Sequence, residues 1–152
     1  DCAYAVGWNA QISAPHIHAL TLGLLDDAAS RILAHNGDSK PLVALDIGSG
    51  TGFMTACLSV LVGDTGTVVG KEHMPELVAA SIRSIDRIPR CRRMRKSGHL
   101  SLVAGDGRDF NCAVTKGRQF DLINCGASVT EVPMELKQLL RPGTSNAGAF
   151  QF

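Results

Sequence analysis

Apolar residues change their spacing along the chain in a regular order. From Ile17 to Ile32 they recur at helical intervals, which predicts a helix over about 16–35. A continuous apolar run at 42–45 then predicts a short strand that is buried on both faces. The same alternation of strand and helix continues toward the C-terminus. Further strands are predicted at 67–69, 100–103 and 120–124, and further helices after residue 52 to about 61, at 75–85 and at 132–140.

Alternating strands and helices favour an α/β fold. The connections are expected to be right-handed crossovers, which place a mostly parallel sheet between helices on both faces. In such open sheets a ligand lies beyond the carboxyl ends of the strands. The length of 152 residues favours a single domain, and 45% hydrophobic against 19% charged residues argues against disorder. Candidate chemistry is therefore sought at the strand ends.

A glycine-rich segment follows the first buried strand. Residues 46–52 read Asp-Ile-Gly-Ser-Gly-Thr-Gly. The dinucleotide fingerprint fails because Phe53 and Thr55 stand where its last glycine is required, and no Gly-Lys-Ser/Thr of a P-loop follows. A carboxylate at Asp46 would repel a pyrophosphate, but it can accept a hydrogen bond from an ammonium group. The segment therefore indicates a ligand that has no phosphates.

Two more acidic residues follow the next two strands. Glu72 comes at the end of the second strand, where an acidic side chain can bind both hydroxyls of a ribose. Asp106 lies between two glycines after the third strand and could accept from the exocyclic amine of adenine. Together with the glycine segment, these positions suit a nucleoside with an amino-acid group. S-adenosylmethionine fits that description.

Two segments carry a resemblance to known enzymes. Residues 46–52 are similar to the cofactor motif of class I S-adenosylmethionine-dependent methyltransferases. Residues 11–19, Gln-Ile-Ser-Ala-Pro-His-Ile-His-Ala, resemble the active-site segment of the protein-L-isoaspartate (D-aspartate) O-methyltransferase family, to which this stretch is quite specific. The resemblance runs from about Asp1 to Gly143. It implies one Rossmann-like class I methyltransferase domain over 1–152, with a mostly parallel central sheet and helices on both faces.

The resemblance also implies a function. Members of the family transfer a methyl group from S-adenosylmethionine to the α-carboxylate of L-isoaspartyl residues in damaged proteins, which supports repair. Ser13 takes the position of the active-site serine. The implied cofactor-binding residues are Ala10, Gln11, Ile12, Ser13, His18, Asp46, Gly48, Gly50, Thr51, Gly52, Glu72, His73, Asp106 and Gly107. Because a carboxylate is already ionised at neutral pH, the reaction needs positioning and exclusion of water, and Ser13 would orient the substrate.

Other site chemistry is not indicated. His16 and His18 are two residues apart, which is a poor spacing for a metal pair on a helix, so no metal is expected. No G-x-S-x-G elbow of a hydrolase occurs. Five cysteines without a C-x-x-C pair, and no apolar run of about 20 residues, favour a cytoplasmic protein without a membrane segment. The net charge of +1 does not favour nucleic acid as a partner, and a monomer is expected.

Three departures from the family pattern leave alternatives open. Lys71 and Glu72 stand where the family has an apolar residue and Asp, and Gln11 stands where a small hydroxyl residue is common. The family's last two strands have no counterpart after residue 143, and we expect the chain to be truncated at both ends. We also expect a sheet that stops at the fourth strand with a bare edge. Residues 1–152 alone are expected to have little activity or stability. A basic run at 87–96 is expected to be a solvated surface connection. The alternatives are a class I methyltransferase that acts on RNA or a small molecule, and a catalytically inactive cofactor-binding remnant.

Overall fold

The computed structural model describes residues 2–7, 10–36, 40–127, 131–142 and 148–150. Asp1 and Gly143, the two ends of the stretch that resembles the methyltransferase family, lie outside these residues. The elements in chain order are β1 (Tyr4–Gly7), β2 (Ala10–Ile12), α1 (Pro15–Asn36), β3 (Val43–Ile47), α2 (Phe53–Leu61), β4 (Thr67–Glu72), α3 (Pro75–Ile85), α4 (Pro89–Lys96), β5 (Leu100–Ala104), β6 (Leu122–Cys125), α5 (Met134–Gln138) and β7 (Gly148–Phe150).

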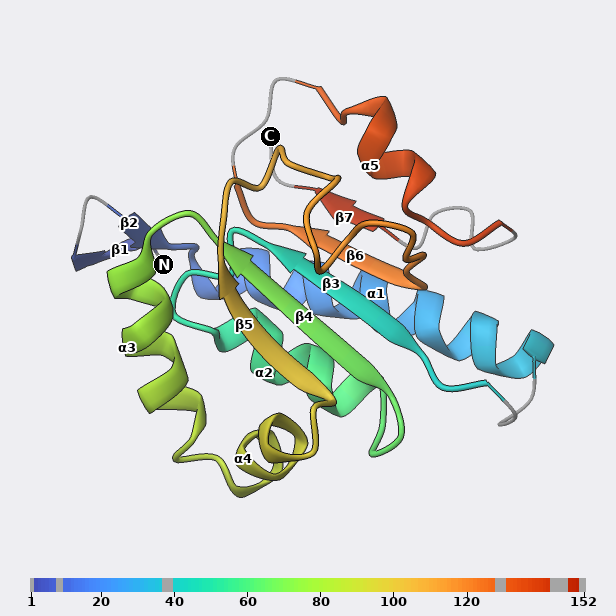
Figure 1. Ribbon diagram of the computed structural model, residues 1–152, viewed down its shortest axis with the longest axis horizontal. Helices are drawn as coiled ribbons and strands as arrows, with labels where there is room; N and C mark the ends of the chain where they lie inside the picture. The colour runs from blue at the N-terminus through green and yellow to red at the C-terminus, as the bar shows by residue number, and fades with distance from the viewer. Residues whose placement is uncertain (1, 8–9, 37–39, 128–130, 143–147, 151–152) are drawn as a thin grey trace.

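A five-stranded sheet in the order β5-β4-β3-β6-β7 forms the centre of the structure. All four neighbouring pairs are parallel, and Leu45 of β3 lies opposite Val69 of β4 and Ile123 of β6. The chain proceeds from β3 toward one edge and then returns to β6 on the other side of β3. This change of direction opens a crevice at the carboxyl ends of the strands. In Figure 1 those ends point toward the β1–β2 hairpin.

Both faces of the sheet carry a hydrophobic core. On one face, Ala44, Val68 and Leu122 belong to a cluster that includes buried residues of α1, α2, α3 and α4. On the other face, Leu45 and Ile123 pack with Leu136 of α5 and with residues of the segment between β5 and β6. Successive strand residues thus point to opposite faces. The continuous apolar runs predicted strands buried on both sides, and the structure confirms them together with the helices on both faces.

At the edge of the sheet beside β6, the structure differs from the prediction made from the sequence. Strand β7 pairs with β6, with Asn124 opposite Ala149, so the sheet does not stop at the fourth strand. The fourth strand itself begins at Leu122, while Phe120 forms only an isolated bridge to Leu140. The last helix is shorter than the predicted 132–140, because it begins only after its N-cap Pro133 and ends at Gln138.

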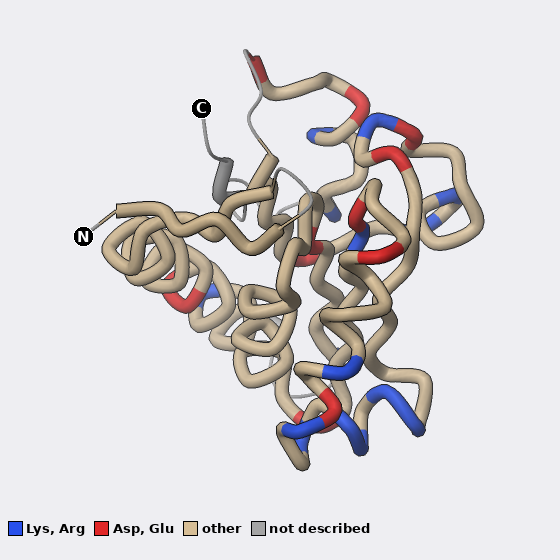
Figure 2. The backbone as a smooth tube through the Cα atoms, turned by 90° about the vertical axis from the view of Figure 1, so that its left-hand side faces the viewer, with Lys and Arg blue, Asp and Glu red and all other residues tan. Residues whose placement is uncertain are grey.

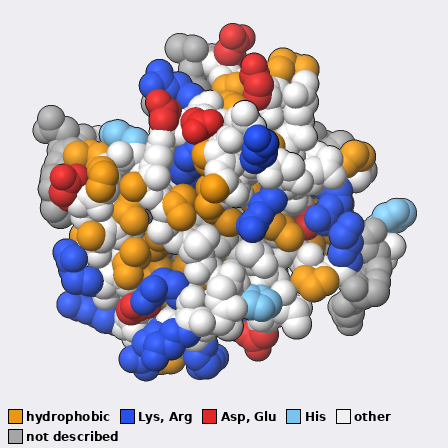
Figure 3. Space-filling view, in the orientation of Figure 1, with side chains coloured by type: hydrophobic (Ala, Val, Ile, Leu, Met, Phe, Trp, Pro, Cys, Tyr) orange, Lys and Arg blue, Asp and Glu red, His pale blue; other side chains and the backbone are white. Residues whose placement is uncertain are grey.

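Helix α4 replaces the surface connection that was predicted for the basic run. Pro89 occupies its first turn, and Cys91 and Met94, three residues apart, are 1% and 4% exposed. This spacing anchors one face of the helix, and the cationic side chains cover the other. Arg95 pairs with Asp86, with 2.8 Å and 2.5 Å between guanidinium nitrogens and carboxylate oxygens. Figures 2 and 3 show Lys and Arg gathered at the end of the molecule that carries α4.

A short antiparallel hairpin, which the sequence did not predict, precedes α1. Strands β1 and β2 pair with Tyr4 opposite Ile12. The hairpin carries the segment that resembles the active-site motif to the carboxyl end of the sheet. Among the described residues, no helix is both long and apolar enough to cross a membrane.

Candidate functional site

The glycine segment forms a tight loop between β3 and α2. Gly48, Gly50 and Gly52 have φ angles of 70°, 52° and 81°, a region that side chains rarely adopt. The backbone N–H groups of Gly48 and Ser49 donate to the Lys71 carbonyl over 2.8 Å and 3.2 Å. A Cβ added at Gly52 would lie 2.9 Å from Cγ2 of Ile85. The loop is therefore fixed against the end of β4 and against α3.

Asp46 is buried under this loop. Its side chain is fully buried and accepts hydrogen bonds from the Thr55 hydroxyl over 2.5 Å and from the Asn124 amide over 2.7 Å. Burial raises the pKa of Asp46 above its ordinary value, and the two hydrogen bonds offset this only in part. The carboxylate links β3, α2 and β6 at the base of the loop.

Glu72 supports the same loop from β4. Its side chain is buried, and Oε2 accepts from the Gly50 N–H over 3.0 Å. Oε1 accepts from the Met74 N–H over 3.2 Å and lies 2.7 Å from Nδ1 of His73. One carboxylate oxygen thus contacts the glycine loop, and the other contacts the start of α3.

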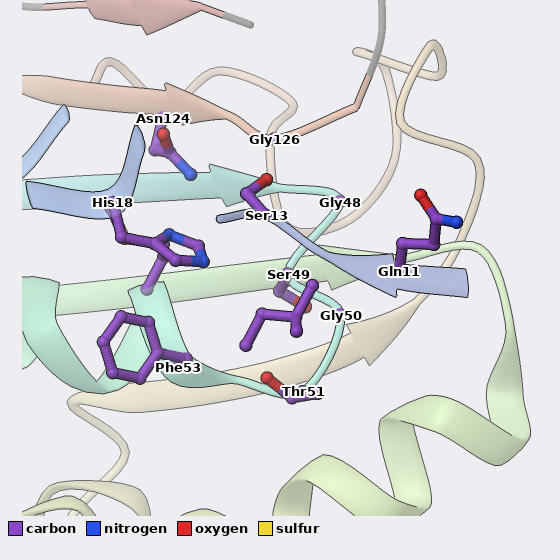
Figure 4. A pocket seen from close by; sticks show the side chains of 12 residues that line it. Gln11, Ser13, His18, Gly48, Ser49, Gly50, Thr51, Phe53, Asn124 and Gly126 are labelled. Atoms are coloured by element: carbon purple, nitrogen blue, oxygen red, sulfur yellow. The ribbon is translucent and has the colours of Figure 1, made fainter. Parts of the chain in front are cut away.

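A first cavity lies between the glycine loop and the segment that joins β2 to α1. It spans about 410 Å³ with its mouth, and Figure 4 shows the side chains that line it. The lining residues are Gln11, Ile12, Ser13, His18, Gly48, Ser49, Gly50, Thr51, Phe53, Met54, Asn124 and Gly126. The buried polar atoms of this lining that form no hydrogen bond with a described residue include Oγ of Ser49 and Oδ1 of Asn124. The cavity therefore offers buried polar atoms that a ligand can satisfy.

His18 and Phe53 form one wall of this cavity. Their ring centroids are 4.9 Å apart with an interplanar angle of 59°. Burial lowers the pKa of His18, and the backbone of Ser13 offsets part of this effect. The lowered pKa favours the neutral imidazole at this wall.

A second cavity adjoins the carboxyl ends of β3 and β6 on the α5 side. It spans about 870 Å³ with its mouth, and its lining residues are Ile47, His73, Asp106, Gly107, Arg108, Phe110, Cys125, Ala127, Pro133 and Leu136. Asp106 is half exposed and is held by Arg108, with 2.6 Å between Nη2 and Oδ2. Hydrogen bonds from the Arg108 guanidinium and N–H hold the pKa of Asp106 well below its usual range. This cavity combines an apolar wall with one ionised acceptor.

The predicted site residues thus collect at one edge of the sheet in two groups. Gln11, Ile12, Ser13, His18, Gly48, Gly50 and Thr51 line the first cavity, and His73, Asp106 and Gly107 line the second. Ala10, Asp46, Gly52 and Glu72 line neither cavity; Asp46 and Glu72 instead brace the loop between them. The roles of all these residues in cofactor binding remain predictions. In the described part of the chain, no three His, Cys, Asp or Glu side chains cluster where they could hold a metal.

Comparison with known protein families shows which enzymes this chain resembles. The family model of protein-L-isoaspartate (D-aspartate) O-methyltransferase matches residues 1–145. The chain belongs to this family. Relatives include protein-L-isoaspartate O-methyltransferase 2 of Arabidopsis thaliana, 43% identical over 94% of this chain and 42% of the relative, and the wheat (Triticum aestivum) enzyme, 40% identical over 94% and 56%. The chain spans about half the length of these curated relatives.

Solved structures agree with this family membership. A putative protein-L-isoaspartate O-methyltransferase from Plasmodium falciparum, solved in complex with S-adenosyl-L-homocysteine, is 28% identical with a TM-score of 0.74 and covers 93% of this chain and 62% of its own. An O-methyltransferase from Bacillus cereus shares the fold at 20% identity, with a TM-score of 0.62 over 88% of this chain and 55% of its own. The fold is that of the Rossmann-like class I methyltransferases.

Sequence reasoning missed several residues of this candidate site. Ser49 lies within the quoted glycine motif, but nothing in the motif singles out its hydroxyl. Asn124 is the next-to-last residue of β6, and the rule that ligands lie beyond strand ends could have found it. Phe53, the first residue of α2, faces His18, and no sequence signal links these two residues.

Proposed function

We propose that the protein is an S-adenosylmethionine-dependent protein-L-isoaspartate O-methyltransferase that methylates the α-carboxylate of L-isoaspartyl residues in damaged proteins. The observation that carries this proposal is the first cavity. There the Ser13 segment, which is specific to the family, lies against the glycine loop at the carboxyl edge of the sheet. Substrate segment and cofactor motif, 35 residues apart in sequence from Ser13 to Gly48, thus share one cavity.

The residues of the two cavities fit the cofactor. Ser49 Oγ and Asn124 Oδ1 are buried without a partner among the described residues, and they can hydrogen-bond an amino-acid group at the glycine loop. In the second cavity, Asp106 can accept from an adenine amine, and Phe110 and Leu136 can cover the base. When bound, S-adenosylmethionine supplies a methyl group on a positively charged sulfur.

The protein's own side chains need only position the substrate carboxylate and the cofactor. The attacking carboxylate is already ionised, so no general base is required of them. Ser13 can orient that carboxylate by hydrogen bonding, and the packed rings of His18 and Phe53 can help to exclude water on their side of the cavity. A neutral His18, which its lowered pKa favours, adds no positive charge near a cationic cofactor.

We further propose that the partners are damaged proteins, that the protein is a cytoplasmic monomer, and that nucleic acid is not a substrate. The cationic side chains gather around α4, which precedes β5 and so lies away from the carboxyl edge that carries both cavities. Two of these side chains are paired, Arg90 with Asp64 and Arg95 with Asp86. Their position supports a surface role and not a role in presenting RNA to the site.

The test is methyl transfer to a synthetic peptide that contains one L-isoaspartyl residue. The matched control is the same peptide with normal aspartate, and binding of S-adenosylhomocysteine and of NAD is measured by calorimetry. We expect methylation of the isoaspartyl peptide alone, and binding of S-adenosylhomocysteine alone. Equal methylation of both peptides, or of neither while an RNA or small-molecule acceptor is methylated, would contradict the proposed substrate.

A further inference from the structure

Lys71 is a buried cation outside the two cavities. The residue is 2% exposed on β4, one position before Glu72. Its Nζ donates to the Asp109 carbonyl over 2.5 Å and lies 3.2 Å from Sγ of Cys112. Among the described residues, no carboxylate forms an ion pair with it. A buried ammonium is costly unless a negative charge compensates it. Asp106 interacts with Lys71 electrostatically without forming an ion pair, and the Cys112 thiol is the group in direct contact that can become negatively charged.

Cys112 lies where this cation can stabilise its thiolate. The residue is partly exposed in the segment between β5 and β6, and its sulfur also lies 3.2 Å from the Thr115 hydroxyl. Desolvation acts against the thiolate, but hydrogen bonds from Thr115, Val114 and Lys71 outweigh it and hold the pKa of Cys112 below its ordinary value. A partly exposed thiol beside a cation is the environment in which cysteines react.

The other cysteines provide a contrast within the same chain. All five are free thiols. Cys57 is partly exposed like Cys112, but burial raises its pKa, and burial raises the pKa of Cys125 as well. Cys91 is 1% exposed. Only Cys112, among the described residues, combines access to solvent with contact to an ammonium group.

We propose that Cys112 is a modification site whose thiolate reacts with hydroperoxides, and that Lys71 is the residue that activates it. The pair joins β4 to the segment after β5, 41 residues apart in sequence. It is distinct from the groups that line the first cavity.

The reaction balances with a hydroperoxide as the oxidant. The sulfur of Cys112 attacks one peroxide oxygen, so that an S–O bond forms while the O–O bond breaks. Sulfur loses two electrons and becomes a sulfenic acid. The peroxide gains them, and its leaving hydroxide or alkoxide takes a proton from the buffer to become water or an alcohol. A cellular thiol can then condense with the sulfenic acid, releasing water and forming a mixed disulfide.

Modification at Cys112 has a consequence that rests on the proposed function. The Lys71 side chain passes under Gly105, where an added Cβ would lie 3.0 Å from Cε of Lys71, and it ends at Asp109 and Cys112. The same segment carries Asp106 and Gly107. We expect a group added to the sulfur to disturb the contact with Lys71 and to shift this segment, and the oxidised protein to bind S-adenosylhomocysteine more weakly.

The first experiment needs no variant. The protein is treated with hydrogen peroxide at pH 7 in the presence of dimedone, which traps sulfenic acids, and the adduct at each cysteine is quantified by peptide mass spectrometry. We expect labelling of Cys112 about tenfold faster or more than labelling of Cys57, because the lowered pKa of Cys112 and the raised pKa of Cys57 both favour the thiolate of Cys112. Equal or slower labelling of Cys112 would overturn the proposal.

The second experiment tests the activating role of Lys71. Lys71→Met keeps the unbranched apolar part of the side chain and removes the charged end, and thermal unfolding checks that the fold persists. We expect labelling of Cys112 to fall about tenfold while that of the exposed Cys2 is unchanged. Unchanged labelling of Cys112 in a folded Lys71→Met protein would remove Lys71 from the proposal.

The third experiment measures the effect on cofactor binding. Calorimetry with S-adenosylhomocysteine is carried out before and after peroxide treatment, on the wild type and on Cys112→Ser. We expect the affinity to fall after treatment in the wild type only. Equal loss in both proteins would disprove the link between Cys112 and the cofactor site. Absence of binding before treatment would count against the proposed function, while the labelling results would still decide the reactivity of Cys112.

Discussion

Oε2 of Glu72 accepts a hydrogen bond from the backbone N–H of Gly50 across 3.0 Å, although the two residues are 22 positions apart in sequence. The contact joins the end of β4 to the glycine loop that follows β3. Glu72 was predicted to bind ribose hydroxyls, a role that the family assigns to the shorter Asp. Its side chain reaches back to the loop and holds it in position, and its role at a ribose stays a prediction.

The first prediction concerns this contact. In Glu72→Ala the N–H groups of Gly50 and Met74 lose their acceptor, and any ribose hydroxyl loses its partner. We expect the affinity for S-adenosylhomocysteine to fall by roughly 1–3 kcal/mol, measured by calorimetry. Glu72→Gln, which keeps one carbonyl oxygen, should fall between wild type and Ala. Wild-type affinity in Glu72→Ala would show that this carboxylate contributes nothing to cofactor binding.

The second prediction separates backbone strain from steric clash at the loop. Gly52 and Gly63 both have positive φ angles, 81° and 75°. An added Cβ meets Ile85 at Gly52 and nothing within 4 Å at Gly63. Gly63→Ala should lower the free energy of unfolding by roughly 1–2 kcal/mol from strain alone. Gly52→Ala should lower it by about 1–3 kcal/mol more, because the side chain overpacks against α3. Chemical denaturation measures both, and equal losses would mean that Ile85 moves aside freely.

The elements that the sequence predicted well are those whose apolar pattern is continuous. The run at 42–45 became β3 because both faces of that strand are buried, on α1 and α2 to one side and on α5 to the other. Helix α4 was missed because only Cys91 and Met94 mark its buried face among five cationic residues. Strand β7 was missed because its three residues, Gly-Ala-Phe, form a strand only by pairing with β6.

The sequence predicted those parts of the candidate site that are formed by a contiguous motif. The glycine loop and the segment around Ser13 are contiguous stretches, and the order of strands in an α/β sheet brings their ends together. The contacts that complete the site join residues far apart in sequence. Asp46 accepts a hydrogen bond from Asn124 across 78 positions, and Glu72 accepts one from Gly50 across 22. No spacing rule for helices or strands connects such positions, so these pairs are visible only in the structure.

The third prediction is a pH dependence that Asp46 causes. Burial raises the pKa of Asp46 above 3.8, so the folded protein holds this proton more tightly than the unfolded chain does. As pH rises from about 4, the unfolded chain releases the proton first, and the contribution of Asp46 to the free energy of unfolding falls until the pH passes the raised pKa. Asp46→Asn removes this loss, and its amide can still accept from Asn124 and donate to the Thr55 hydroxyl.

The measurement is the free energy of unfolding of wild type and Asp46→Asn from pH 4 to pH 9 by denaturant titration. The value for Asp46→Asn minus that for the wild type should increase with pH and then level off. A difference that stays flat over this range would show that the pKa of Asp46 is not raised in the folded state. A difference that decreases with pH would show a lowered pKa, and the carboxylate would then be stabilised by its partners in spite of its burial.

The last prediction concerns Ser13, which lies on the first cavity between β2 and α1. If its hydroxyl orients the substrate carboxylate, Ser13→Ala removes a hydrogen bond that matters most in the transition state. Methylation of an isoaspartyl peptide should then fall about tenfold or more, since about 1.4 kcal/mol corresponds to a factor of ten. Calorimetry with S-adenosylhomocysteine should give the wild-type affinity, and Ser84→Ala, which changes an exposed serine of α3, should leave both measurements unchanged. A parallel loss of methylation and of cofactor affinity in Ser13→Ala would place the hydroxyl on the cofactor, and unchanged methylation would remove Ser13 from the reaction.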